Sequence, residues 1–324
     1  ELRYGLEEWE KEFAGVRDLL RVQHTVPISR QVFAYCAAFH LTGDERLLEY
    51  ARAGIDYLFG RGRDENGVPF THIIDGVGGP GPEHRTAQEI SYQLLGPSFY
   101  YYLTRDPTVL AGVLPVKDYI FAYYGGDDWR QLRWCGEDFT GPDGESHHRA
   151  KSLMITAQLD RLNAYLMLLT PILPAAHQER WQRDLDQLVD LLVSDYYNEE
   201  HNVFWGDVSN PDSLSLETPN TDYGHTAKAF WFIWQAARHR GDEKLVAWAE
   251  DKAEQLAGEA YLQDVGAWAL KKGPEGNVRH RQWLSYAELD QLTATMSLEK
   301  PALEGYLAHT YDYWMRTFVD YRHG

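Results

Sequence analysis

The chain has 324 residues, of which 44% are hydrophobic and 14% aromatic, and its formal net charge is −18. A chain of this length and composition can bury a large core. The acidic balance excludes a broadly basic surface, so we expect no nucleic-acid partner and no attraction to anionic membranes. No apolar run reaches the roughly 20 residues that a membrane-spanning helix needs, so we expect no membrane partner.

The two cysteines, Cys36 and Cys135, show neither CxxC nor Cys/His metal spacing. Cys36 lies in the apolar run FAYCAAF and is expected to be a core thiol, so the pattern indicates no disulfide framework and no metal site. We expect a cytoplasmic protein. Because the chain begins at Glu1, a periplasmic or secreted protein stays an alternative.

A recurring pattern organises the chain into pairs of helices. The end of one helix, a short polar break and the start of a second helix can be read in LTGDERLLEYA, LTRDPTVLAGV and RGDEKLVAWAE, with weaker echoes elsewhere. The breaks recur about every 60 residues, which is typical of stacked helical hairpins. Asp44, Asp106 and Asp242 are expected to cap the second helices by accepting hydrogen bonds from backbone N–H groups.

The two helices of each hairpin differ in pattern. Several of the first helices are apolar or aromatic on almost every face, which predicts burial on both sides and makes this set the inner helices; the first helices are 28–41, 90–103, 153–168, 224–239 and 285–298. The second have one apolar and one charged face, which predicts outer helices; they are 45–59, 106–123, 175–195, 242–256 and 300–318. We therefore predict an all-α (α/α)6 barrel in a single domain, 1–324. Its last inner helix is expected to be absent from this chain, and an open array of five hairpins is the alternative.

Polar residues in the first turns of the inner helices are the candidate site residues. Backbone N–H groups and the helix dipole favour negative charge at these turns, which are expected to line the mouth of the barrel. Arg30 is expected either to bind a ligand oxygen or to form a structural ion pair with Asp160 or Glu288. Trp283 is expected either to stack on a sugar ring or to pack in the core. The other candidates are His84, Gln88, Glu89, Tyr92, Gln158, Asp160, His225, His280, Tyr286 and Glu288.

His225 follows Gly224 at the start of an inner helix and has Tyr223, Phe230 and Trp231 nearby in the sequence. A helix N-terminus favours the neutral imidazole, which can act as a base. A purely structural histidine is the alternative.

Three segments resemble the N-acylglucosamine 2-epimerase family, which includes cellobiose 2-epimerases and mannose isomerases. YGHTAKAFWFIWQAAR, which contains His225, is similar to a Gly-His helix of that family. SRQVFAYCAAFHLTGDERLLEYA resembles its first inner hairpin, in which an arginine at the position of Arg30 contacts sugar. RQWLSYAELDQL resembles a tryptophan-containing segment and matches Trp283 and Glu288. The resemblance implies an (α/α)6 barrel that acts on a small-molecule sugar without metal or other cofactor.

The resemblance also implies a mechanism. The sugar ring opens, His225 transfers a proton at the carbon next to the carbonyl, and Arg30 and helix N-termini hold the enediolate. The other substrate-binding residues are then expected to be Gln88, Tyr92, Gln158, Trp283 and Glu288. The family has a glutamate three residues after the histidine, where this chain has Lys228, so we expect no carboxylate to orient His225. Asp160 replaces a family histidine and is expected to act as a weak acid or base with a raised pKa.

Two other functions stay open. A glycoside hydrolase on the same fold would use a pair of carboxylates, Asp160 and Glu288, with Glu89 and Asp222 as further candidates. A sugar-binding protein without activity would fit Lys228 and Asn163, which occupy positions where the family has glutamates. A polysaccharide lyase is disfavoured because the acidic chain would repel an anionic polymer. A homodimer is an assembly that the sequence leaves open.

Overall fold

The computed structural model describes residues 21–81, 84–125, 133, 139–140, 146–147 and 152–322. They fall into two compact units, which are described separately. The first unit lies within Glu1–Lys151 and Asn163–Pro174, and the second within Ser152–Leu162 and Ala175–Arg322. The prediction of a single domain stays a prediction.

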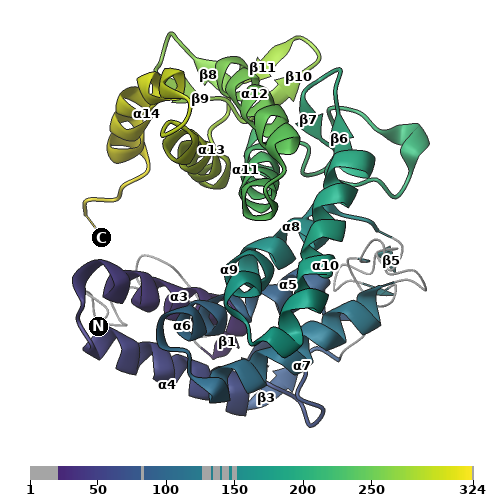
Figure 1. Cartoon of the computed structure of the whole chain (residues 1–324), viewed down its shortest axis with the longest axis vertical. Coiled ribbons are helices and arrows are strands. Elements are labelled where there is room, and N and C mark those ends of the chain that lie inside the picture. Colours follow the sequence, from purple (N-terminus) through teal and green to yellow (C-terminus); the bar gives the residue numbers. More distant parts are fainter. Residues whose placement is uncertain are drawn as a thin grey trace. The chain divides into compact units, whose positions relative to one another are not determined.

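The first unit combines a small sheet with antiparallel helices (Figure 1). Its three-stranded antiparallel sheet has the order β1 (Val22–His24), β2 (His72–Ile74), β3 (Val77–Gly79). A second, two-stranded hairpin pairs β4 (Phe139–Thr140) with β5 (Ser146–His147). The helices are α3 (Thr25–Thr42), α4 (Arg46–Gly60), α5 (Ala87–Tyr92), α6 (Leu95–Thr104), α7 (Pro107–Tyr124), α9 (Met167–Leu169) and the 3-10 turn η3 (Thr170–Ile172).

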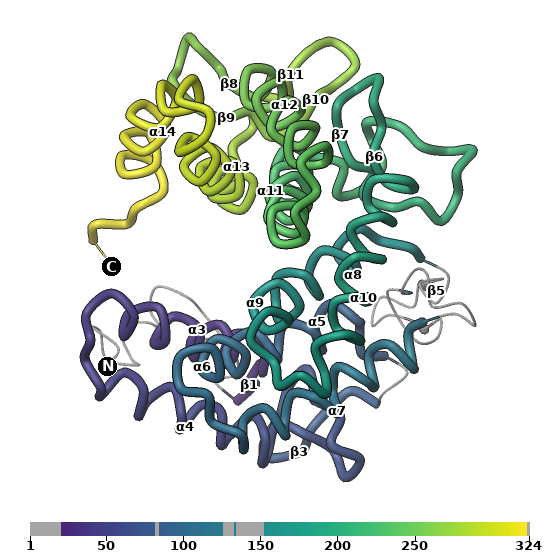
Figure 2. The backbone as a smooth tube through the Cα atoms, viewed as in Figure 1, coloured from purple at the N-terminus to yellow at the C-terminus, as the bar shows by residue number. Residues whose placement is uncertain are grey.

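Two glycines allow α3 to pack closely on α4 and α6, which lie beside it in Figure 2. A Cβ atom at Gly54 would lie 2.4 Å from the Val32 side chain, and one at Gly96 would lie 2.4 Å from the carbonyl oxygen of Ser29. The Gly96 N–H also donates to the Ser29 hydroxyl at 3.0 Å. Cys36 is fully buried on α3, as predicted, and burial raises its pKa to about 12.

The second unit consists of helical hairpins joined by short strands. Its helices are α8 (Ile155–Arg161), α10 (Ala175–Leu191), η4 (Leu192–Tyr196), η5 (Pro211–Ser213), α11 (Tyr223–Arg240), α12 (Glu243–Ala260), α13 (Trp283–Met296), η6 (Pro301–Leu303) and α14 (Glu304–Thr317). The π-helix η2 (Leu162–Leu166) joins α8 to α9 along the chain. The strands form three hairpins, namely β6 (Tyr197–Asn198) with β7 (Val203–Phe204), β8 (Tyr261–Leu262) with β9 (Ala267–Trp268), and β10 (Lys271–Gly273) with β11 (Gly276–Val278).

Helix α11 is the most deeply buried long helix of this unit and contacts α8, α10, α12 and α13. Its aromatic run fills the core, where Phe230, Ile233 and Trp234 are buried. At its first turn, a Cβ atom at Gly224 would lie only 2.4 Å from the Cα atom of Ser285. The glycine therefore lets the start of α13 meet the start of α11.

The predicted pairs of helices are confirmed to within a few residues at most boundaries, although the predicted helix 90–103 is divided into α5 and α6. Asp106 and Asp242 cap α7 and α12 as predicted. Asp44 also accepts from a backbone N–H, that of Arg46, but lies one residue before the cap position of α4. Burial on both sides, which was predicted for several inner helices, is found in α8 and α11, whereas Phe33 on α3 and Trp283 at the start of α13 are exposed.

None of the helices in the described ranges combines the length and the apolar character needed to cross a bilayer.

Candidate active site

A carboxylate and an imidazole meet at the first turn of α11. Asp222 is the N-cap residue, and its Oδ1 accepts the backbone N–H of His225 at 2.9 Å. Its Oδ2 lies 2.7 Å from Nδ1 of the His225 ring. The expectation that no carboxylate orients His225 is therefore wrong. The carboxylate comes from three residues before the histidine instead of three residues after it.

The environment raises the pKa of His225 above its ordinary value of 6.5. Burial alone lowers this pKa, but the negative charge of Asp222 and its hydrogen bond raise it and prevail. In the neutral ring, a proton on Nδ1 donates to Asp222 and leaves the lone pair on Nε2. This arrangement prepares Nε2 to accept a proton.

The first turn of α13 supports Asp222 from the other side. The Ser285 hydroxyl lies 3.4 Å from Asp222 Oδ1 and 3.3 Å from the side-chain oxygen of Gln282. Ser285 is buried, and it is the residue that Gly224 allows to approach. The carboxylate that holds His225 is thus itself held between two helices.

One helical turn further along α11, Lys228 lies among carboxylates. Its Nζ is 2.7 Å from Asp160 Oδ1 on α8 and 4.0 Å from Glu288 Oε1 on α13. The side chains of Lys228 and Asp160 are only 8% and 4% exposed, whereas that of Glu288 is 19% exposed. The structure therefore brings two predicted site residues, Asp160 and Glu288, to one ammonium group.

Burial raises the pKa of the Glu288 carboxyl above its ordinary value of 4.5. The charge of Lys228 acts in the opposite direction without cancelling the effect, and the charge of Asp160 adds to the increase. A raised pKa suits the Glu288 carboxyl group to exchanging a proton with a ligand oxygen. We call Asp222, His225, Lys228, Asp160 and Glu288 the α11 cluster; all five lie in the second unit.

The remaining candidate residues of the second unit differ in how far their side chains are exposed to solvent. Gln158 is fully buried and accepts a hydrogen bond from Arg161, so it is placed to support α8 and has no surface open to a ligand. Trp283 is 56% exposed at the start of α13, so its interpretation as a core residue is wrong.

Among the candidate residues of the first unit, Arg30 and Glu89 contact other residues of that unit. The guanidinium of Arg30 lies over the ring of Tyr92, 4.5 Å from its centroid, and Arg30 is exposed while Tyr92 is buried. Gln88 is half-buried on α5. The Glu89 carboxylate accepts hydrogen bonds from the backbone and hydroxyl of Thr86, which makes it part of a capping box.

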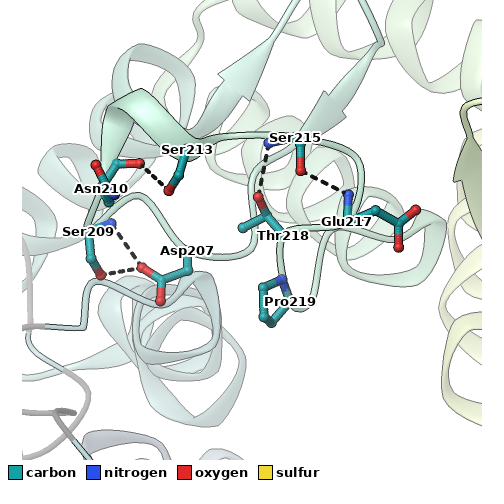
Figure 3. A pocket seen from close by; sticks show the side chains of 8 residues that line it. All are labelled: Asp207, Ser209, Asn210, Ser213, Ser215, Glu217, Thr218 and Pro219. Carbon is teal, nitrogen blue, oxygen red and sulfur yellow. Dashed lines mark hydrogen bonds between the residues drawn. The ribbon is translucent and has the colours of Figure 1, made fainter.

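A polar loop precedes α11 and lines an open pocket of about 330 Å³ (Figure 3). Its side chains are largely engaged in turns within the loop, such as Asp207 with Ser209 and Ser215 with Thr218. The loop is fixed at its base, where the Gly206 N–H donates to the Thr221 hydroxyl at 2.9 Å. The pocket is lined by Asp207, Ser209, Asn210, Ser213, Ser215, Glu217, Thr218 and Pro219.

Sequence reasoning missed Lys228, Ser285 and Gln282 as parts of a site. The sequence contained a signal only for the N-cap residue Asp222, since an aspartate at the start of a helix typically caps it. In the described ranges, no group of three or more His, Cys, Asp or Glu side chains is placed to hold a metal ion.

No family model and no curated protein matches this chain. Solved structures do. The cellobiose 2-epimerase from Bacillus thermoamylovorans matches with a TM-score of 0.77 at 16% identity, over 93% of this chain and 78% of that one. A D-mannose isomerase matches with a TM-score of 0.75 at 14% identity, over 94% and 77% of the two chains. An α-1,6-mannanase from a Salegentibacter species matches with a TM-score of 0.57 at 12% identity, over 89% and 75%.

At these identities the likeness shows the fold. The predicted fold class, an all-α (α/α)6 barrel like that of the N-acylglucosamine 2-epimerase family, is confirmed.

Proposed function

We propose that this protein is a carbohydrate epimerase or isomerase that acts on a free reducing sugar, with His225 as its general base and acid. The observation that carries the proposal is the Asp222–His225 pair at the start of α11, because a carboxylate-held imidazole is suited to moving a proton. The likeness in fold to a cellobiose 2-epimerase and a D-mannose isomerase supports the reaction class.

In the proposed reaction, the ring-opened sugar presents a carbonyl group. Nε2 of His225 removes the proton from the neighbouring carbon, the electron pair forms the carbon–carbon double bond, and the carbonyl oxygen takes up negative charge. If the enediolate turns its other face toward Nε2, return of the proton from His225 to the same carbon gives the epimer; return of the proton to the former carbonyl carbon gives the isomer. The carboxylate of Asp222 stabilises the imidazolium formed in the first step.

The other residues take separate roles. Asp160 bonds to Lys228, so we assign it to holding that ammonium and withdraw the expectation that it transfers a proton. The raised pKa of Glu288 suits it to exchanging protons with sugar oxygens. Arg30, Tyr92, Gln88 and Trp283 stay proposed substrate-binding residues.

The test is proton NMR in heavy water with a panel of free aldoses, ketoses, N-acetylhexosamines and cellobiose. We expect the C2 proton of at least one sugar to exchange with solvent, and the exchange to be lost in His225→Ala. His239→Ala is the matched control, because His239 lies exposed near the other end of the same helix. Absence of exchange with every sugar, in a folded protein, contradicts the proposal.

A glycoside hydrolase is the second candidate, because the pKa of Glu288 is raised and a mannanase shares the fold. It predicts release of nitrophenol from an aryl glycoside that is lost in Glu288→Gln and kept in His225→Ala. A sugar-binding protein without activity predicts heat of binding in calorimetry with neither exchange nor cleavage.

A further inference from the structure

Lys228 is the one cation of the α11 cluster, and the proposed reaction develops a negative charge. We propose that Lys228 is the electrophile of this site: its ammonium binds the carbonyl oxygen of the open-chain sugar and carries the charge of the enediolate. This inference rests on the proposed function and adds a catalytic residue to it.

The spacing along α11 places Lys228 beside the base. Residues three apart on a helix lie on the same face with Cβ atoms about 5–6 Å apart, and Lys228 follows His225 by three. The positive charge of Lys228 lowers the pKa of His225, so the two groups are within electrostatic reach of one another. The reaction needs this combination, since the proton leaves the carbon directly bonded to the carbonyl carbon.

Asp160 fixes the cation. The two groups lie 2.7 Å apart and are almost fully buried, so their attraction is screened little by water. An ammonium bonded to a carboxylate donates hydrogen bonds and offers no lone pair for attack on a carbonyl. The pairing therefore favours an electrostatic role for Lys228 over a covalent one.

We expect the sugar to approach Lys228 from the side on which Glu288 lies. Its carboxylate is 4.0 Å from Nζ, beyond hydrogen-bond distance, and its side chain is more exposed than that of Asp160. A sugar oxygen that enters on this side meets both the ammonium and a carboxyl group whose pKa is raised by burial. Glu288 can then return a proton to the oxygen that Lys228 holds.

The step balances within the sugar and these side chains. The C–H bond breaks and its proton goes to Nε2 of His225. The electron pair forms the carbon–carbon double bond, and the carbonyl π electrons move to the oxygen held by Lys228. When the proton returns to carbon, the electron pairs move back, so no oxidant or reductant is required.

The test removes the ammonium together with the carboxylate that lies closest to it. In Lys228→Met/Asp160→Asn, both charges are lost and the shapes are nearly kept. We expect kcat to fall by about 10²–10³, as for loss of one oxyanion donor, with KM changed only a few-fold. Asp160→Asn alone keeps the ammonium and is expected to retain at least tenfold more activity than the double variant. Lys244→Met, at an exposed lysine of α12, is expected to match the unaltered protein.

Equal activities in the double variant and Asp160→Asn would show a structural ion pair and overturn the inference. So would borohydride reduction that attaches the sugar covalently to Lys228, because that result identifies an imine.

A binding measurement separates this inference from the proposed function. Aldonohydroxamates resemble the planar, negatively charged enediolate, whereas alditols are neutral. We expect the double variant to bind the hydroxamate about 10- to 100-fold more weakly than the unaltered protein, and to bind the alditol equally well. If no sugar shows exchange, the proposed function fails, and the hydroxamate result still decides whether Lys228 forms an oxyanion site; equal affinities overturn it.

Discussion

Asp222 binds His225 twice, through the backbone N–H at 2.9 Å and through the ring Nδ1 at 2.7 Å. The same carboxylate thus starts helix α11 and sets the orientation of the imidazole. Because the cap fixes Asp222 relative to the backbone of His225, the ring is held by a short and rigid link. Ser285 adds a second support from α13.

The pH dependence of activity follows from this pair. His225 must be neutral to accept a proton, so activity falls as the pH drops through its pKa. Because Asp222 raises that pKa, we expect the acid limb of kcat/KM to have its midpoint above 6.5. In Asp222→Asn the raising charge is gone and burial remains, so the midpoint should move to lower pH and kcat should fall. Equal midpoints in both proteins would contradict the assignment.

The close approach of α11 and α13 depends on Gly224. In Gly224→Ala the new Cβ would lie 2.4 Å from the Cα atom of Ser285, so the helices must separate. We expect the free energy of unfolding to fall by about 1–3 kcal/mol, together with activity. Gly258→Ala on α12 is the matched control, because its Cβ meets nothing closer than 3.8 Å, and it should be stabilising by up to about 1 kcal/mol. Urea unfolding measures both.

Loss of Lys228 alone should cost stability as well as activity. Lys228→Met removes the ammonium that lies 2.7 Å from the nearly buried carboxylate of Asp160, and breaking a buried ion pair typically costs about 3–5 kcal/mol. Adding Asp160→Asn should recover a large part of that loss, since the carboxylate closest to the lost ammonium is then removed as well. Urea unfolding of the two variants measures which is more stable. If Lys228→Met is as stable as the double variant, the buried carboxylate of Asp160 does not need the ammonium of Lys228 for stability.

Trp283 should affect binding and leave stability unchanged. It is 56% exposed, so Trp283→Ala should change the free energy of unfolding by no more than about 0.5 kcal/mol. If its ring stacks on the sugar, KM should rise roughly 2- to 10-fold, as for an aromatic contact of about 0.5–1.5 kcal/mol. Trp234→Ala provides the contrast, because Trp234 is buried and its loss should cost about 3–5 kcal/mol. An unchanged KM in Trp283→Ala would remove this residue from the site.

The helices could be predicted because their causes are local. Apolar spacing sets the buried face of each helix, and Asp106 and Asp242 cap the helices that follow them. The sequence did not distinguish the inner helices that are buried on both sides, α8 and α11, from α3 and α13, which keep exposed residues. An apolar sequence indicates that a helix can be buried, but not which elements cover it.

The site was predicted only in part, because its contacts join distant parts of the chain. Asp160 and Lys228 are 68 residues apart in the sequence, so no local sequence pattern predicts their ion pair. The resemblance directed attention to the position three residues after His225, where Lys228 occurs. The carboxylate that orients His225 belongs to Asp222, three residues before His225. The preference for aspartate at helix N-caps would have identified Asp222.

The central claim is that His225, held by Asp222, moves the proton at the carbon next to a sugar carbonyl. The most direct test is the rate of C2 hydrogen–deuterium exchange, followed by NMR in heavy water, for the unaltered protein, His225→Ala and His239→Ala on one sugar. We expect exchange in the unaltered protein and in His239→Ala, and a loss of at least about 10²-fold in His225→Ala. Exchange that persists in His225→Ala, or that occurs in none of the three folded proteins, would contradict it.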